Sequence, residues 1–310
     1  MRIMFMGTPE ISAICLDALI GAGLDVCAVV TGADKPRGRG NVMTPTPTKA
    51  RAMESGIPTY TPDSLKTEEF AEVLRDVAPE LIIVVAYGKI LPISVLQFPK
   101  HGCINLHVSL LPKYRGAAPM QRAIMDGEKR TGVTVMYMAE GLDTGDIISQ
   151  SIFDIGPEDD FEAVHDRSAA VGGDLLVKTV ADIEAGRAVR TPQSEESASY
   201  AKKIEKVDCR IDFSLPASRL DCIIRGVTPI PGAFCYQGGR MLKIFRAVPV
   251  EGHGRPGEVI AADQKGEGSF TVACGEGALL VRGVIPEGKG RMSAGDYLRG
   301  RKIAVGDLLE

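Results

Sequence analysis

The sequence contains no long apolar run. Its longest ones, such as LIIVVAYG over residues 81–88, are far too short to span a bilayer. This excludes a protein with membrane-spanning helices and argues against a membrane partner. The first ten residues, MRIMFMGTPE, hold no secretory signal and instead predict a strand. A cytoplasmic location is therefore expected.

Cysteine pairs and dinucleotide-binding glycines are also missing. The seven cysteines are an odd number, and no two of them form a CxxC pair. With only four histidines besides, we expect reduced core thiols, no disulfide and no metal. After the first predicted strand the chain reads FMGTPEISA, with one glycine in place of GxGxxG. This argues against a nicotinamide oxidoreductase.

Charge is unevenly distributed along the chain, whose overall net charge is −4. Residues 1–200 hold 19 Lys and Arg against 27 Asp and Glu, whereas residues 201–310 hold 17 against 13. A basic C-terminal third therefore follows an acidic body. Such a surface suggests an anionic macromolecular partner, although a charge of this size also falls within ordinary surface variation.

Hydrophobic patterning in the first half of the chain predicts alternating strands and helices. The expected elements are strand 2–7, helix 8–23, strand 24–32, helix 64–79, strand 80–88 and strand 102–109. Strand, helix and strand in this order favour βαβ units. We therefore predict a doubly wound α/β domain with a mostly parallel, Rossmann-like sheet.

The last third of the chain has a different pattern. A polar stretch near residues 187–206 resembles an interdomain linker. Short strand-like runs punctuated by glycine follow it, which is typical of a small antiparallel barrel. The predicted organisation is a first domain over 1–188, a linker over 189–206, and a C-terminal β-barrel domain over 207–310.

Three segments of the first domain have further expectations. Residues 33–47, ADKPRGRGNVMTPTP, cannot be helix or strand throughout, and form either a surface loop or a basic loop that reaches over a ligand. Residues 131–155 predict a hairpin around EGLDTGD. Residues 159–186 predict a long helix, in which Gly172-Gly173 marks a place where it could break.

Candidate catalytic side chains stand at the end of the strand at 102–109. Asn105 and His107 are two positions apart, so they face the same way, and ligands of open α/β sheets bind at the carboxyl ends of strands. The EGLDTGD loop could add the carboxylate of Asp143. An amide donor, an imidazole and a carboxylate suit acyl-type transfer through a tetrahedral intermediate. The alternative is that Asn105 and His107 anchor a loop and Asp143 shapes a turn.

The longer sequence motif around these residues favours the catalytic interpretation over the structural one. INLHVSLLPKYRGAAP, followed by GLDTGDI with Asp143 38 positions after Asn105, resembles the folate-dependent formyltransferase family. Its pattern is Asn-x-His-x-Ser-Leu-Leu-Pro, a glycine-containing stretch, and Leu-Asp-x-Gly. The segments GTPE, DKPRGRG, VVAYGKILP and RGAAPMQRAI extend the resemblance over essentially the full chain.

The resemblance implies an activity and a set of site residues. A formyl group would move from 10-formyltetrahydrofolate to the α-amine of methionine on initiator methionyl-tRNA, with Asn105, His107 and Asp143 at the catalytic positions. Other positions are implied to line the folate site; these are Val85, Ala86, Tyr87, Gly88, Ser109, Leu110, Leu111 and Pro112. The DKPRGRG loop is implied to enter the acceptor end of the tRNA, with Arg39 at its recognition arginine.

The C-terminal domain is implied to be an OB-like barrel that holds the tRNA. Basic residues that could contact it are Lys35, Arg37, Arg39, Lys202, Lys203, Lys206, Arg210, Arg240, Lys243 and Arg246. Each of these outside the DKPRGRG loop, taken alone, is better explained as a plain solvated charge. A monomer that binds tRNA and not DNA is expected.

Two departures from the family pattern and two rival functions remain. Asn41-Val42 stands where some members carry lysines, which lowers the charge of the loop, and Ile230 stands where some carry an aromatic residue.

One rival function is that of a folate-dependent formyltransferase for a small amine, such as a nucleotide-linked amino sugar. The other is a pure RNA-binding protein, which would leave Asn105, His107 and Asp143 without a role.

Overall fold

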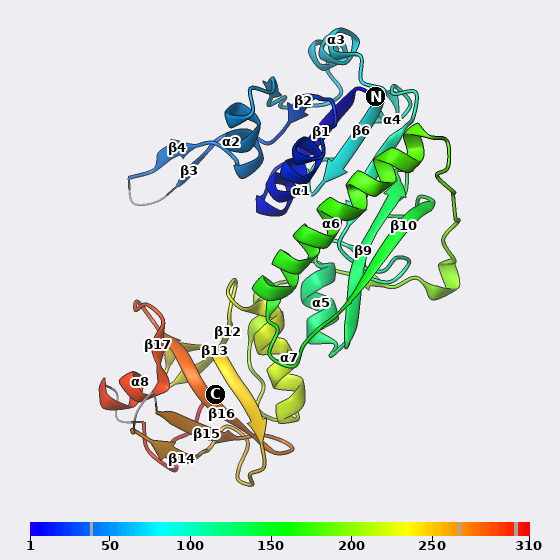
Figure 1. The fold of residues 1–310 in the computed structure, drawn as a ribbon. Helices are drawn as coiled ribbons and strands as arrows, with labels where there is room; N and C mark the ends of the chain where they lie inside the picture. The colour runs from blue at the N-terminus through cyan, green and yellow to red at the C-terminus, as the bar shows by residue number, and fades with distance from the viewer. Residues whose placement is uncertain (38–39, 266–267, 301–302) are drawn as a thin grey trace. The chain divides into compact units, whose positions relative to one another are not determined.

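A computed structural model describes residues 1–37, 40–265, 268–300 and 303–310 of the chain (Figure 1). They form two compact units, each assembled from several stretches of chain. Unit 1 comprises Met1–Gly116, Thr131–Phe153 and His165–Ala201. Unit 2 comprises Ala117–Arg130, Asp154–Val164 and Lys202–Glu310. The domain limits expected from the sequence, 1–188, 189–206 and 207–310, stay a prediction.

Unit 1 is built around a mostly parallel sheet of seven strands, in the order β10-β9-β7-β6-β1-β2-β5. The strands are β1 (Ile3–Gly7), β2 (Val26–Val30), β5 (Thr59–Tyr60), β6 (Leu81–Val85), β7 (Cys103–His107), β9 (Arg130–Tyr137) and β10 (Ile147–Asp154). Strand β1 pairs in parallel with β2 and β6, and β7 pairs in parallel with β6. Strand β9 runs antiparallel to β7. The predicted α/β fold is confirmed.

Helices cover both faces of this sheet because the strands are apolar on both faces. Ile3 and Phe5 of β1 point into a core with α1 (Glu10–Gly21) and α6 (Phe161–Glu184). Met4 and Met6 point into a second core on the other face. That core is completed by α3 (Glu68–Val77) and α4 (Ile93–Leu96). Alternate residues of one strand thus bury on opposite faces, as a parallel sheet requires.

Helix α6 continues without a break through Gly172-Gly173 (Figure 1). The glycines serve packing instead. A Cβ on Gly172 would stand 2.6 Å from a Leu106 methyl carbon, and one on Gly173 would stand 2.8 Å from the Ala18 Cβ. The possible break in the helix suggested by the sequence is therefore wrong. The two glycines stand where α6 approaches β7 and α1 so closely that a side chain would not fit.

The basic segment at 33–47 is not wholly irregular. Strands β3 (Lys35–Arg37) and β4 (Val42–Thr44) pair as an antiparallel ribbon. Helix α2 (Pro47–Glu54) follows, and the Thr46 side chain caps it by accepting from the Lys49 N–H. Arg39, the predicted recognition arginine, lies outside the described residues.

The described residues of unit 2 form an antiparallel sheet with α-helices packed around it. Its strands are β12 (Ala233–Gln237), β13 (Arg240–Val250), β14 (Val259–Asp263), β15 (Ser269–Ala273), β16 (Ala278–Pro286) and β17 (Met292–Ser293). The order is β12-β13-β16-β15-β14, and β17 pairs with β16. The helices are α5 (Pro119–Met125), α7 (Ala217–Val227) and α8 (Ala294–Gly300). The predicted antiparallel C-terminal unit is confirmed.

The C-terminal residues join the two ends of this sheet. The Glu310 N–H and carbonyl both bond Tyr236 of β12, and the Leu309 N–H donates to the Gly257 carbonyl. The Val259 N–H of β14 donates to the Asp307 carbonyl. Residues 307–310 therefore run between the outer strands and satisfy edge groups that would otherwise be open.

Other expectations concern cysteines, metals and membranes. All seven cysteines are free thiols, and five of them are buried. Within the described ranges, no three His, Cys, Asp or Glu side chains gather as metal ligands. None of the helices described is both long and apolar enough to cross a bilayer.

Candidate active site

Strand β7 carries Asn105 and His107 near its carboxyl end. Asn105 is paired with Val84 of β6 and Met136 of β9, and His107 is paired with Thr134. His107 is buried and Asn105 is half-buried. No hydrogen bond joins the Asn105 side-chain amide to any residue that the structure describes. An amide held in a strand and free to donate can stabilise an oxyanion.

The imidazole of His107 lies between a carbonyl and a carboxylate. Its Nε2 is 2.9 Å from the Tyr114 carbonyl oxygen, and its Nδ1 is 3.6 Å from Asp143 Oδ2. A carbonyl can only accept, so Nε2 carries a hydrogen. Nδ1 is then the nitrogen that can gain or lose a proton, and Asp143 stands beside it to stabilise the protonated ring.

The predicted hairpin is confirmed: β9 and β10 are neighbouring strands, and Asp143 lies in the loop between them. Its carboxylate accepts the Gly116 N–H at 2.8 Å. Its backbone carbonyl accepts from Gln193 Nε2 at 2.8 Å. The structure therefore brings Asp143 beside His107, which shares strand β7 with Asn105, and the catalytic roles of the three residues stay predictions.

Left-handed backbone is concentrated here. Ala86, Tyr114 and Asp143 have φ values of 45°, 59° and 52°. Non-glycine residues pay steric energy in this region, and such residues cluster at functional sites. Two of these three supply the groups that contact His107.

The Ser109–Pro112 stretch forms a tight loop held by its own contacts. Ser109 Oγ donates to the Lys113 carbonyl at 2.7 Å, and the Ser109 carbonyl accepts from Thr134 Oγ1 at 2.7 Å. The Leu111 N–H donates to Thr134 Oγ1, and the Leu111 carbonyl accepts from Gln150 Nε2. The Leu111-Pro112 peptide is cis. The Ser109 hydroxyl thus shapes the loop, and the role of Ser109, Leu110, Leu111 and Pro112 toward folate stays a prediction.

The 85–88 segment divides into inward and outward residues. Val85 and Tyr87 are buried, and the Tyr87 hydroxyl has no hydrogen-bond partner among the described residues. Burial raises the pKa of Tyr87 to about 12. Ala86 and Gly88 are exposed at the end of β6, with positive φ. A ligand here would meet mainly Ala86, Gly88 and backbone, so the contribution of Val85 and Tyr87 stays a prediction.

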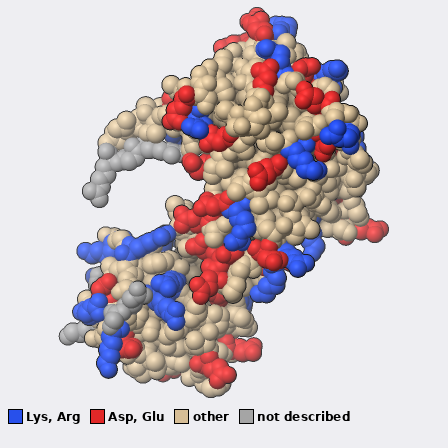
Figure 2. All heavy atoms as spheres, viewed as in Figure 1, with Lys and Arg blue, Asp and Glu red and all other residues tan. Residues whose placement is uncertain are grey.

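The basic residues predicted to contact tRNA lie in two places. Lys35 is exposed on β3, and Arg37 ends that strand. In unit 2, several are exposed; these are Lys202, Lys203, Lys206, Arg210, Arg240 and Arg246. Lys243 is half-buried, and its Nζ donates to the Pro231 carbonyl at 2.7 Å. Figure 2 shows Lys and Arg side chains gathered on the visible face of unit 2. The tRNA contacts stay predictions.

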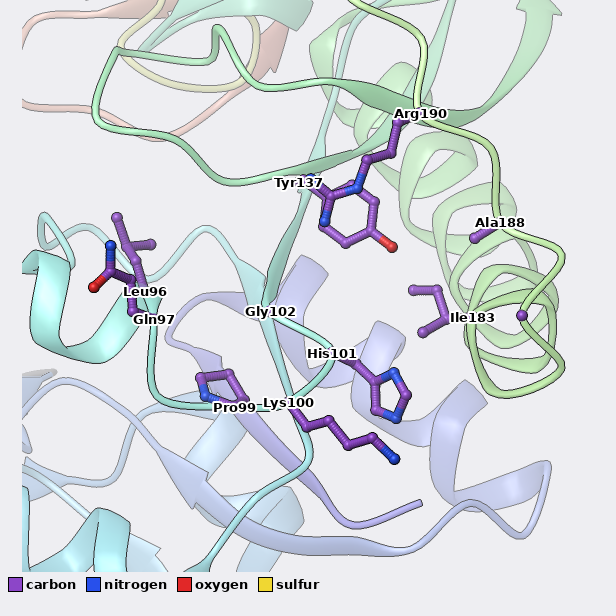
Figure 3. Close-up of a pocket in the computed structure, with 11 residues that line it drawn as sticks. Leu96, Gln97, Pro99, Lys100, His101, Gly102, Tyr137, Ile183, Ala188 and Arg190 are labelled. Carbon is purple, nitrogen blue, oxygen red and sulfur yellow. The ribbon is translucent and has the colours of Figure 1, made fainter.

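A pocket of about 420 Å³ lies elsewhere in unit 1, at the amino end of β7 (Figure 3). Arg190 stacks over the Tyr137 ring at 3.7 Å on one side of it, and Lys100 and His101 lie on the other. None of the predicted catalytic or folate residues lines this pocket. It is therefore distinct from the site built around His107.

Sequence reasoning missed several residues of the site. Tyr114 and Gly116 act through backbone groups, so their side chains give no signal. Gln193 lies 50 positions from Asp143 in the stretch expected to be a linker. Arg115 stands within the INLHVSLLPKYRGAAP motif with no role assigned from the sequence, yet it is 1% exposed and reaches Gln193 and Glu195.

Comparison with known proteins places this arrangement in context. The family described as "Formyl transferase" matches residues 1–180, and the one described as "Formyl transferase, C-terminal domain" matches residues 203–302. The methionyl-tRNA formyltransferase of Geotalea uraniireducens (strain Rf4) is 45% identical over 309 residues. That match covers 100% of this chain and 98% of that protein.

Solved structures with lower identity share the fold. HypX from Aquifex aeolicus in complex with tetrahydrofolic acid has a TM-score of 0.64 at 18% identity, covering 100% of this chain and 50% of that one. The N-formyltransferase from Helicobacter canadensis, in complex with folinic acid and dTDP-3-aminofucose, has a TM-score of 0.66 at 20% identity. It covers 90% of this chain and 97% of that one.

Proposed function

The chain belongs to the methionyl-tRNA formyltransferase family, and from that premise we propose that it moves the formyl group of 10-formyltetrahydrofolate to the α-amine of methionine on initiator tRNA. It is an enzyme that formylates methionyl-tRNA. The proposal adds the donor, the choice of the initiator and the residues that act. The observation that carries it is His107 between the Tyr114 carbonyl and Asp143, with Asn105 on the same strand and no partner for its amide among the described residues.

The chemistry is a transfer between two nitrogens. The methionine amine attacks the formyl carbon, a C–N bond forms, and the formyl oxygen gains negative charge. The Asn105 amide donates to that oxygen, and protonated His107 adds positive charge nearby. The bond from the formyl carbon to the folate nitrogen then breaks. The amine has lost one proton and the folate nitrogen has gained one, so the step balances without a metal.

His107 is the group that carries the proton. With Nε2 committed as a donor to the Tyr114 carbonyl, Nδ1 is the atom that takes it up and releases it. Asp143 Oδ2, 3.6 Å away, stabilises the ring while the proton is bound. The Gly116 N–H holds that carboxylate from the other side.

Folate and tRNA would engage different parts of the chain. The end of β6 at Ala86–Gly88 and the 109–112 loop adjoin the strand that carries Asn105 and His107, which supports their assignment to the donor. The basic residues of the β3–β4 ribbon and unit 2 would meet the phosphates of the tRNA, because such contacts supply sequence-independent affinity. A cytoplasmic location and a monomeric state remain predictions.

The test is formyl transfer from 10-formyltetrahydrofolate to four acceptors in parallel: methionyl initiator tRNA, methionyl elongator tRNA, glycinamide ribonucleotide and an amino-sugar nucleotide. Selective transfer to initiator tRNA is expected. Transfer to the amino-sugar nucleotide alone would favour the small-amine alternative and discard the tRNA assignment.

Two variants test the residues. His107→Ala and Asp143→Asn are each expected to lower kcat by about 10²–10⁴-fold. The first variant removes the group that carries the proton, and the second removes the negative charge that stabilises the protonated ring. His165→Ala, on α6 beside Asp166, is the matched control and should keep the normal rate. Near-normal rates in both site variants would remove the proposed mechanism.

A further inference from the structure

The two groups that contact His107 both depend on backbone in an unfavourable conformation. Tyr114, whose carbonyl faces Nε2, and Asp143, whose carboxylate faces Nδ1, have φ values of 59° and 52°. Such conformations are sterically unfavourable for residues other than glycine and persist only where the surroundings hold them. One segment, residues 193–201, supplies a hydrogen bond to each of them.

Gln193 holds the loop that carries Asp143. Its Nε2 donates to the Asp143 carbonyl at 2.8 Å and to the Gly145 carbonyl at 2.7 Å. Its Oε1 accepts from Arg115 Nε at 3.1 Å and from Arg115 Nη2 at 3.0 Å. Carbonyls only accept and a guanidinium only donates, so the amide has one possible orientation, with both ends satisfied.

Arg115 fixes the far side of this amide. The guanidinium is buried, and it also forms a two-pronged ion pair with Glu195 at 2.9 Å on each arm. Glu195 raises the pKa of Arg115, and Arg115 lowers that of Glu195. Because the fork is rigid and always charged, it sets where the Gln193 oxygen stands.

The end of the same segment holds Tyr114 and Gly116. Ser199 Oγ accepts the Tyr114 N–H at 2.9 Å, and the Ser199 carbonyl accepts the Arg115 N–H at 2.8 Å. Strand β11 (Tyr200–Ala201) pairs in parallel with β8 (Arg115–Gly116). A Cβ on Gly116 would lie 2.9 Å from the Ala201 carbonyl oxygen. That approach leaves the Gly116 N–H aimed at the Asp143 carboxylate.

We propose that Gln193 is a positioning residue for Asp143, and that residues 193–201 set the geometry around His107 through Gln193 and Ser199. The inference rests on the proposed roles of His107 and Asp143. Residues that looked like a linker in the sequence would thus act in catalysis through others, without touching substrate. Lys202 begins unit 2, so this segment is the last part of unit 1 before the chain leaves it.

The decisive variant is Gln193→Glu in the full-length protein. A carboxylate keeps the size of the side chain and still accepts from Arg115, but it cannot donate to the Asp143 and Gly145 carbonyls and would repel them. If the side chain merely partners Arg115, the variant should behave normally. If it positions Asp143, kcat should fall by about 10- to 100-fold, since a displacement near 1 Å costs rates of that order.

The readouts are kcat, KM for both substrates, and Tm. We expect kcat to fall while both KM values stay within about twofold and Tm changes little, because the Asp143 loop acts on the reacting groups. Glu196→Gln, an exposed neighbour, is the matched control and should match the parent. A kcat within twofold of the parent, a rise in KM alone, or a kcat loss accompanied by a large fall in Tm would each overturn the positioning role.

Asp143→Asn in the same assay separates this inference from the proposed function. If Asp143→Asn is inactive and Gln193→Glu is normal, only the positioning role fails. If Asp143→Asn is itself near normal, the proposed catalytic assignment fails and the role of Gln193 falls with it.

Discussion

Gly145→Ala is expected to displace the loop that carries Asp143. Gly145 is buried, and the added Cβ would lie 1.8 Å from the Tyr137 carbonyl oxygen and 2.8 Å from its carbon. Ordinary van der Waals contact begins at 3.4 Å, so the backbone must open by about 1.6 Å. Because Gln193 binds both the Asp143 and Gly145 carbonyls, that movement reaches the catalytic carboxylate.

The size of the effect follows from this geometry. A shift of more than 1 Å at a catalytic group costs about 100-fold in rate, and overpacking a buried backbone costs about 1–3 kcal/mol of stability. Steady-state kcat for formyl transfer and Tm by calorimetry measure the two effects. Gly21→Ala is the control, since nothing lies within 4 Å of its added Cβ at the end of α1. Parent-like kcat and Tm for Gly145→Ala would refute the argument, because the turn would then absorb the carbon without moving Asp143.

Two further predictions concern ionisable groups. Arg122 lowers the pKa of Asp208, so this pair should stabilise unit 2 above the unfolded Asp pKa of about 3.9 and lose its effect as pH falls below it. Denaturant unfolding at pH 7 and pH 3 should show that Arg122→Ala lowers the free energy of unfolding at pH 7 and narrows the gap between the free energies at the two pH values. An unchanged gap would contradict the predicted direction of the pH dependence. Burial raises the pKa of the Cys15 and Cys103 thiols to about 12, so a thiol reagent at pH 8 should leave both unmodified until the protein unfolds. Mass spectrometry of the labelled native protein checks this, and rapid labelling of either would contradict it.

The predictions that the structure confirmed were those for which the local sequence pattern and the packing of the folded chain favour the same conformation. Alternating apolar runs and helical spacing produced the parallel sheet because each strand had to bury both faces. Asn105 and His107 could be assigned because a two-residue spacing fixes their common side whatever the rest of the chain does. The hairpin that carries Asp143 followed from two alternating strands around a glycine-containing turn.

The predictions that failed or were never made involve contacts between distant segments. Gly172-Gly173 looked like a helix break, but only the packed neighbours Leu106 and Ala18 reveal that the glycines allow close approach. Helix α5 lies early in the chain, yet it packs on α7 in unit 2, where a Cβ on Gly226 would stand 2.5 Å from a Met125 side-chain carbon. Hydrophobic spacing tells which side of a helix is buried, but not against which partner.

The sequence by itself determined the class of fold, the strand that carries Asn105 and His107, and the family to which the chain belongs. Each depends on spacing within a short stretch or on a long ordered motif. The tertiary structure alone decided which nitrogen of His107 can take up and release a proton, because the Tyr114 group that holds Nε2 as a donor is a backbone carbonyl. It also decided that Gln193, 50 positions away, holds Asp143, since a hydrogen bond between distant segments depends on how the chain folds back and leaves no periodic trace in the sequence.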